Sequence, residues 1–145
     1  MRELPRKLSV EELAELFEGR TRLVDRLAEV EDPLGQADDV LAGMSEEEKL
    51  EALDAHPAIG ARRLSARSAA EQGSDADPTI LSELAYLNRV YEEKFGFRFV
   101  VFVHGRSKRE ILEVLRERIA RTPEEELDTG CRELVAIARD RWTGV

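Results

Sequence analysis

Apolar residues recur along most of this chain at the three- and four-residue spacing of an amphipathic helix. The clearest stripes are Val10, Leu13, Leu16 and Phe17; Leu23, Val24 and Leu27; Leu81, Leu84, Leu87, Tyr91 and Phe95; Ile111, Leu112, Leu115 and Ile119; and Leu127, Cys131, Leu134, Val135, Ala138 and Trp142. Each stripe predicts a helix with one buried face. The pattern therefore predicts an all-α fold, a compact bundle of about seven or eight helices with residues 1–145 forming a single domain.

Capping boxes mark where several of these helices begin. In this motif a Ser or Thr hydroxyl accepts a hydrogen bond from the backbone N–H three residues on, and a Glu there reaches back to the cap's own N–H. The pairs are Ser9/Glu12, Ser45/Glu48, Ser68/Glu71, Ser107/Glu110 and Thr122/Glu125. The residues 31–35 and 73–78, which are rich in Pro, Gly and Asp, are predicted to separate helices.

Residues 95–103 do not follow the helical pattern. The run Phe-Gly-Phe-Arg-Phe-Val-Val-Phe-Val is aromatic and β-branched, and Gly96 is placed to end the preceding helix. No other run in the chain has this character, so a strand would lack a partner within the chain. We therefore expect an extended segment that crosses the core. Its unpaired backbone N–H and C=O groups would suit the wall of a pocket for a polar ligand.

The charge balance narrows the classes of partner. The chain has 31 acidic and 22 basic residues, for a formal charge of −9. Such a surface repels nucleic acid, so we expect a small-molecule ligand instead. No apolar run is long enough to span a membrane, and the chain has one cysteine, Cys131, at an apolar core position. We expect a cytoplasmic protein.

The sequence contains two histidines, His56 and His104. His56 precedes Pro57, and the residue before a proline is disfavoured in the α conformation, so a helix that begins near Ser45 ends by His56. The partial negative charge of a helix C-terminus favours imidazolium, so we expect the pKa of His56 near or somewhat above the free value of about 6.5. Such a histidine suits proton transfer, and it equally suits a role that is limited to capping the helix carbonyls.

Four segments occur together in a specific order. They are HPAIG from His56, SAAEQ from Ser68, LNRVYEEKFGFRFVVFV from Leu87 and ELVAIARDRW ending at Trp142. With this order and spacing the chain resembles the 2-oxo-4-hydroxy-4-carboxy-5-ureidoimidazoline (OHCU) decarboxylase family, from about Phe17 to Trp142. The resemblance implies an all-α fold, commonly a homodimer, and cofactor-independent decarboxylation of OHCU to (S)-allantoin and CO2 in urate catabolism.

The resemblance also implies roles for individual residues. His56 matches the acid/base histidine, Glu71 belongs with Ser68 and Gln72 to the polar substrate-binding cluster, and Arg141 matches the arginine of the final helix that contacts the substrate. As a catalytic hypothesis, Glu71 orients His56. The implied substrate-binding positions are Pro57, Ser68, Gln72, Phe97, Phe99, Val100 and Val101. No metal site is expected, since two histidines without ligand spacing do not furnish a usual one.

Three positions depart from the pattern of many family members. Ala58 stands where many have Asp, Arg98 where many have Pro, and Glu31–Leu34 where many carry an Arg-Pro-Phe element. Because Arg98 lies beside the expected pocket wall, it could accept a different anion, so a divergent paralogue acting on another ureido or carboxylate substrate is an alternative. A second alternative is a non-catalytic helical interaction module, in which the extended segment would augment a partner.

Overall fold

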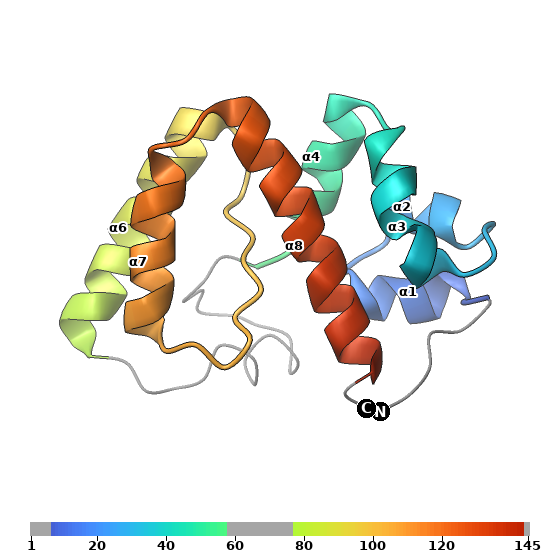
Figure 1. The fold of residues 1–145 in the computed structure, drawn as a ribbon, viewed down its shortest axis with the longest axis horizontal. Coiled ribbons are helices and arrows are strands. Elements are labelled where there is room, and N and C mark those ends of the chain that lie inside the picture. Colours follow the sequence, from blue (N-terminus) through green and yellow to red (C-terminus); the bar gives the residue numbers. More distant parts are fainter. Residues whose placement is uncertain (1–6, 58–76, 144–145) are drawn as a thin grey trace.

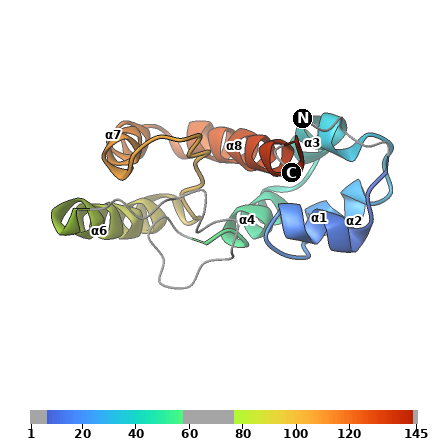
Figure 2. The same ribbon diagram turned by 90° about the horizontal axis from the view of Figure 1, so that it is seen from below.

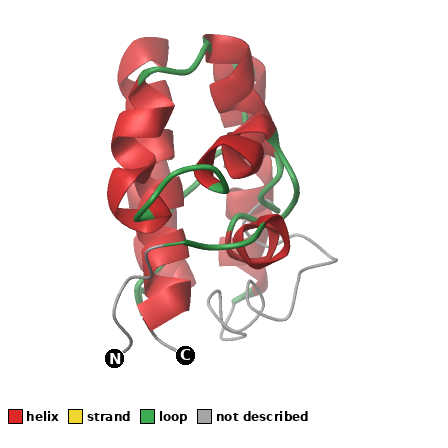
Figure 3. Cartoon of the chain, turned by 90° about the vertical axis from the view of Figure 1, so that its right-hand side faces the viewer, coloured by secondary structure: helices red, strands yellow, loops and turns green. Residues whose placement is uncertain are grey.

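The computed structural model describes residues 7–57 and 77–143. Within these ranges it contains α-helices and no strand, as Figure 3 shows. The helices are α1 (Val10–Leu16), α2 (Arg22–Leu27), α3 (Pro33–Ala42), α4 (Glu46–Asp54), α6 (Pro78–Phe95), α7 (Lys108–Ile119) and α8 (Pro123–Thr143). The all-α prediction is confirmed. The predicted Ser68/Glu71 capping box lies outside the described residues.

The other predicted helix starts are where the sequence places them. Complete capping boxes begin α1, α4 and α7 at Ser9, Ser45 and Ser107. At α8 the N–H of Glu125 donates to Thr122 Oγ1 at 3.2 Å, and the N–H of Thr122 donates to Glu125 Oε1 at 3.1 Å.

The predicted break at residues 31–35 is too long. Helix α3 begins at Pro33, inside that range, and the N–H of Gly35 donates to the Asp32 side chain at 3.2 Å. Asp32 is a good N-cap and proline is favoured at the first helical position, so this pair starts a helix instead of only interrupting the chain.

Helix α8 lies between the pair α6 and α7 on one side and the group α1–α4 on the other (Figure 1). Helices α1, α3 and α4 pack against it, and α6 packs against α7. Figure 2 shows two layers, with α7, α8 and α3 in one and α6, α4 and α1 in the other. Gly130 lets α4 approach α8 closely, because a Cβ at this position would lie 3.2 Å from Leu53 Cδ2.

The chain between α6 and α7 is extended, as predicted. Gly96 ends α6 in the left-handed conformation with φ +80°, which glycine adopts at little cost. The following segment runs between α7 and α8 (Figure 1) and has no strand partner among the described residues. Its buried residues are Phe97, Phe99, Val100, Val101 and Val103. The segment therefore crosses the core.

One predicted core position is wrong. Leu81 was placed on the buried stripe of α6, but its side chain is 37% exposed. The buried face of α6 is formed by Leu84, Asn88 and Tyr91. A polar residue such as Asn88 does not register in an apolar pattern, so the pattern placed the centre of this face too near the start of the helix.

Candidate active site

His56 lies directly beyond the end of α4. Helix α4 ends at Asp54, and the N–H of His56 donates to the carbonyl of Leu53 at 3.2 Å. The residue is 4% exposed, and Pro57 after it is half-buried. Its Nε2 atom is buried and has no hydrogen-bond partner among the residues that the structure describes. Buried polar atoms in folded proteins nearly always have a partner, so an open Nε2 in this position is suited to a bound ligand.

The predicted pKa of His56 is wrong in direction. Burial, as the largest cause, and the positive charges of Arg141 and Arg98 together lower the pKa to about 4, against the opposing effect of the Glu18 carboxylate. The local sequence reveals only the effect of the helix terminus, which stabilises a cation by about 2 kcal/mol at most. The loss of hydration on burial destabilises the imidazolium by more than the helix terminus stabilises it. His56 is therefore neutral at pH 7, the form of an imidazole that can accept a proton.

Arg141 reaches this region from the last turn of α8. It is buried, and its guanidinium donates to the carbonyl of Leu16 at the end of α1 at 3.1 Å. The same guanidinium forms an ion pair of 2.9 Å with the carboxylate of Glu18. Both charges act on the pKa of His56, so the structure brings the predicted Arg141 and His56 into one electrostatic environment.

Glu18 belongs to this environment although the sequence analysis did not select it. Its side chain is largely buried, and its backbone is left-handed with φ +65°. A residue other than glycine rarely adopts this conformation, and such strain is often kept at functional sites. The sequence gives little signal for it, since Phe17-Glu18-Gly19 resembles any helix end.

The extended segment forms a wall with open backbone groups. Phe97, Phe99, Val100 and Val101 are all buried. Arg118 Nη1 donates to the carbonyl of Val100 at 2.7 Å. The backbone N–H groups of these four residues have no hydrogen-bond acceptor among the described residues. Buried N–H groups need partners, so these amides can bind a ligand that presents carbonyl oxygens.

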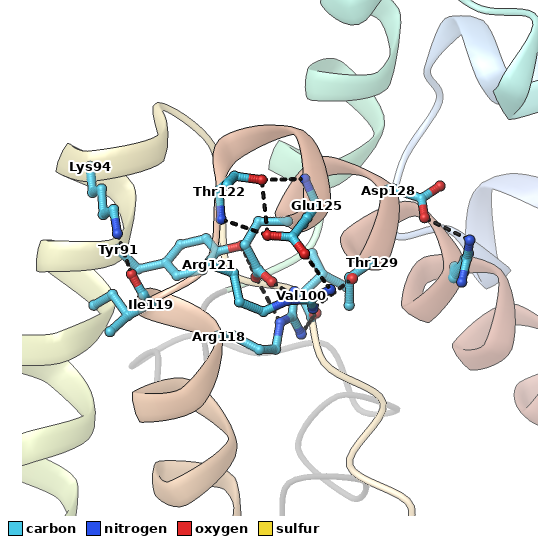
Figure 4. Close-up of polar contacts among 12 residues, drawn as sticks. Tyr91, Lys94, Val100, Arg118, Ile119, Arg121, Thr122, Glu125, Asp128 and Thr129 are labelled. Carbon is cyan, nitrogen blue, oxygen red and sulfur yellow. Dashed lines mark hydrogen bonds and ion pairs between the residues drawn. The ribbon is translucent and has the colours of Figure 1, made fainter.

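A second buried polar group contacts the extended segment through Arg118 and Val100 (Figure 4). Tyr91 Oη donates to Glu126 Oε1 at 2.7 Å, and Arg118 Nε donates to the same oxygen at 2.7 Å. Arg121 Nη1 donates to Glu126 Oε2 at 3.0 Å. The Arg118 guanidinium also stacks over the Phe99 ring, 4.6 Å from its centroid. We call Tyr91, Arg118, Arg121 and Glu126 the Glu126 cluster.

The remaining predicted features either lie outside the described residues or concern other parts of the molecule. Ser68, Glu71 and Gln72 lie outside the described residues, so their place relative to His56 stays a prediction. Cys131 is buried, which raises the pKa of its thiol to about 11 and keeps it protonated. Within the described ranges, no group of three or more His, Cys, Asp or Glu side chains is arranged to hold a metal ion. In the same part of the chain, no helix is long and apolar enough to cross a membrane.

Comparison with known families decides how this site is interpreted. The family model described as OHCU decarboxylase matches residues 2–143. The chain belongs to the OHCU decarboxylase family. The resemblance found in the sequence is therefore confirmed, and it extends over nearly the whole chain.

Curated relatives of this family member come from several organisms. The 2-oxo-4-hydroxy-4-carboxy-5-ureidoimidazoline decarboxylase of Haloferax volcanii is 30% identical over 145 residues, covering 91% of this chain and 85% of that protein. The uric acid degradation bifunctional protein TTL of Arabidopsis thaliana is 35% identical over 102 residues, 63% of this chain. The chain spans only 32% of the Arabidopsis protein, and only 22% of a similar bifunctional protein from Bacillus sp. (strain TB-90).

Solved structures share the fold. A crystal structure of OHCU decarboxylase in the presence of (S)-allantoin superposes with a TM-score of 0.75 and 26% identity, covering 90% of this chain and 94% of that one. A crystal structure of (S)-allantoin synthase gives a TM-score of 0.71 over 93% of this chain and 48% of that chain, at 22% identity. The helical arrangement of this OHCU decarboxylase family member is thus that of known structures.

Proposed function

We propose that this family member catalyses the decarboxylation of OHCU to (S)-allantoin and CO2 in urate catabolism, without a cofactor. The observation that carries the proposal is the buried, neutral His56 with an open Nε2, next to the buried Arg141. Family membership supplies the substrate class, since the Haloferax relative is named for this reaction and one solved relative was crystallised with the product.

The reaction itself needs little from a cofactor. The carbon–carbon bond to the substrate carboxylate breaks, CO2 leaves, and the electron pair enters the unsaturated imidazoline ring. A proton then adds to the ring carbon. Because the substrate contains its own electron acceptor, the protein has to hold one face of it, exclude water and move protons.

His56 suits the proton steps. A neutral imidazole can accept the proton of the substrate's 4-hydroxy group through its open Nε2. The resulting imidazolium is destabilised by burial and by the nearby Arg141 charge, so it readily returns its proton to the ring carbon. Arg141 steadies the substrate anion while Glu18 holds its guanidinium.

The remaining assignments complete the proposal. The backbone N–H groups of Phe97, Phe99, Val100 and Val101 donate to the ring and ureido carbonyls, with Pro57 beside them. Glu71 orients His56, and Ser68 and Gln72 bind the substrate. We also propose that the chain is one domain, acts in the cytoplasm, forms a homodimer and does not bind nucleic acid.

The experiment generates OHCU in situ from urate with the enzymes that precede this step and follows circular dichroism. The proposal predicts a fast rise of one allantoin enantiomer with the wild-type protein and with His104→Asn, which replaces the exposed histidine. It predicts only the slow, racemic background with His56→Asn. A wild-type protein that adds nothing to the background would refute the proposed function.

A further inference from the structure

Arg98 links the end of α4 to the extended segment. It lies in the extended segment, and its backbone N–H donates to Asp54 Oδ1 at 3.0 Å. Its Nη1 donates to the carbonyl of Asp54 at 3.2 Å and also to the carbonyl of His56. The side chain and the backbone of Arg98 are thus hydrogen-bonded to the last turn of α4, and the side chain is also hydrogen-bonded to the backbone of His56.

The contacts fulfil a need of the helix end. The last carbonyls of a helix have no partner within the helix, and they are partially negative. The Arg98 guanidinium satisfies two carbonyls of this turn with a positive charge, and Asp54 completes a reciprocal link by accepting from the Arg98 backbone. This link joins the backbone that carries the imidazole to the extended segment.

The guanidinium is itself held from a third element. Arg98 Nε donates to Glu92 Oε1 on α6 at 3.2 Å. The side chain is 31% exposed and borders a hollow of about 290 Å³ lined by Asp54, Glu92, Gly96 and Phe97. Arg98 also lines this hollow, and the two acidic side chains there, Asp54 and Glu92, already accept hydrogen bonds from Arg98. The structure therefore does not favour the alternative in which Arg98 binds a different anionic substrate.

We propose that Arg98 is a positioning residue: by bridging Glu92 on α6 and the His56 carbonyl, it fixes the imidazole of His56 relative to the pocket wall. Its importance for turnover rests on the proposed function of His56. The link between Arg98 and His56 does not, because it is a property of the folded protein whether or not substrate is bound.

A change at Arg98 therefore alters His56 in a predictable direction. The charged groups that face His56 from the described elements are Arg141 on α8, Glu18 beyond α1 and Arg98 in the wall. Arg98 and Arg141 lower the pKa of His56, whereas Glu18 raises it. Removing Arg98 takes away one of the two positive charges and loosens the turn, so both effects raise the pKa.

The first experiment titrates the imidazole protons by NMR, with the exposed His104 as an internal reference. Arg98→Ala should raise the pKa of His56, and Arg98→Lys should raise it less. The matched control is Arg106→Ala, since Arg106 also donates from its guanidinium to two loop carbonyls, those of Phe102 and Val103. Equal His56 titrations in wild type and Arg98→Ala would overturn the proposal.

The second experiment measures turnover of in situ OHCU as a function of pH. Because Arg98 holds the base but does not touch substrate, Arg98→Ala should lower kcat about tenfold, change KM less and move the acid limb upward. Arg98→Lys should recover part of kcat. If Arg98→Ala does not fold, Glu92→Gln takes its place, because it releases the guanidinium. Glu92→Gln should then lower kcat and move the acid limb upward, each by less than expected for Arg98→Ala. Unchanged kcat and pH profile in Glu92→Gln and Arg98→Lys alike would then overturn the proposal.

The two experiments separate two failures. If the wild-type protein shows no turnover, the proposed function fails, and the NMR titration still decides whether Arg98 acts on His56. If turnover is present and Arg98→Ala behaves like Arg106→Ala in both measurements, the positioning role fails and the proposed function stands.

Discussion

Two buried polar groups contact the extended segment, and the side chains at their centres differ in how fully they are paired. In the Glu126 cluster a fully buried carboxylate accepts from two arginines and one tyrosine, so both of its oxygens are satisfied. Around His56, two positive charges and one negative charge surround a neutral imidazole whose Nε2 has no partner in residues 7–57 and 77–143. We call His56, Arg141, Glu18 and Arg98 the His56 cluster.

The difference separates a group that stabilises the fold from one that is available for chemistry. A buried carboxylate with matched partners holds elements together, here α6, α7 and α8. A buried base left without a partner is costly unless something binds it, and such perturbed groups gather at functional sites. The account therefore expects mutations in the Glu126 cluster to reduce stability first and mutations at His56 to reduce turnover first.

The largest expected effect is on turnover. His56→Asn removes the base but keeps a small polar side chain, so we expect kcat to fall by about 10²–10⁴-fold. The free energy of unfolding at pH 7 should fall less than in Glu126→Gln. The circular dichroism assay and urea unfolding measure the two quantities. Retention of more than about a tenth of wild-type kcat would remove His56 from the reaction.

Next is the stability of the Glu126 cluster. Glu126→Gln keeps the shape but leaves Arg118 buried without a countercharge, so we expect a loss of about 3–5 kcal/mol in the free energy of unfolding. The control is Glu124→Gln, an exposed position in the same first turn of α8, where the loss should stay below about 0.5 kcal/mol. Similar urea midpoints for the two variants would show that the cluster does not stabilise the fold.

The pH dependence of stability sharpens the comparison. The folded protein holds the pKa of His56 near 4, below the unfolded value of about 6.5, so the unfolded chain takes up the proton first as pH falls. The contribution of His56 to the free energy of unfolding is therefore complete above about pH 6.5. Up to about 3 kcal/mol of it is lost between pH 6.5 and 4. Urea unfolding of wild type and His56→Asn at pH 7 and 4.5 measures this loss. Parallel changes in the two proteins would contradict it.

The smallest effect concerns one hydrogen bond. Tyr91→Phe removes a donor to Glu126, which keeps both arginines, so we expect a loss of about 1 kcal/mol. Burial and this hydrogen bond both raise the pKa of Tyr91, so the phenol remains a donor at neutral pH. Tyr86→Phe, at a position that is 58% exposed, is the control and should change nothing measurable. Equal urea midpoints for the two variants would mean that the bond contributes nothing.

Much of the fold follows from local sequence. Capping boxes at Ser9, Ser45 and Ser107 start helices because each box satisfies backbone groups within four residues. Gly96 and the aromatic run after it predict the extended segment for equally local reasons. The position of His56 at a helix end also follows, since Pro57 alone forbids continuation.

The chemistry of the site does not follow from local sequence. The pKa of His56 depends on burial and on Arg141, Arg98 and Glu18, which other parts of the chain supply. Likewise, Glu124, Glu125 and Glu126 look alike in the sequence, and only packing shows that Glu126 is the buried one. Charges that act across elements are set by tertiary structure, so a local rule such as the helix-terminus effect can be outweighed.

The most direct test of the central claim is the pH profile of kcat/KM for the wild-type protein with in situ OHCU. This profile reports the pKa of the essential base in the free enzyme. A neutral, buried His56 predicts a flat profile through neutral pH and an acid limb near pH 4. An acid limb at about pH 6.5, the value of a solvated imidazole, would contradict the account.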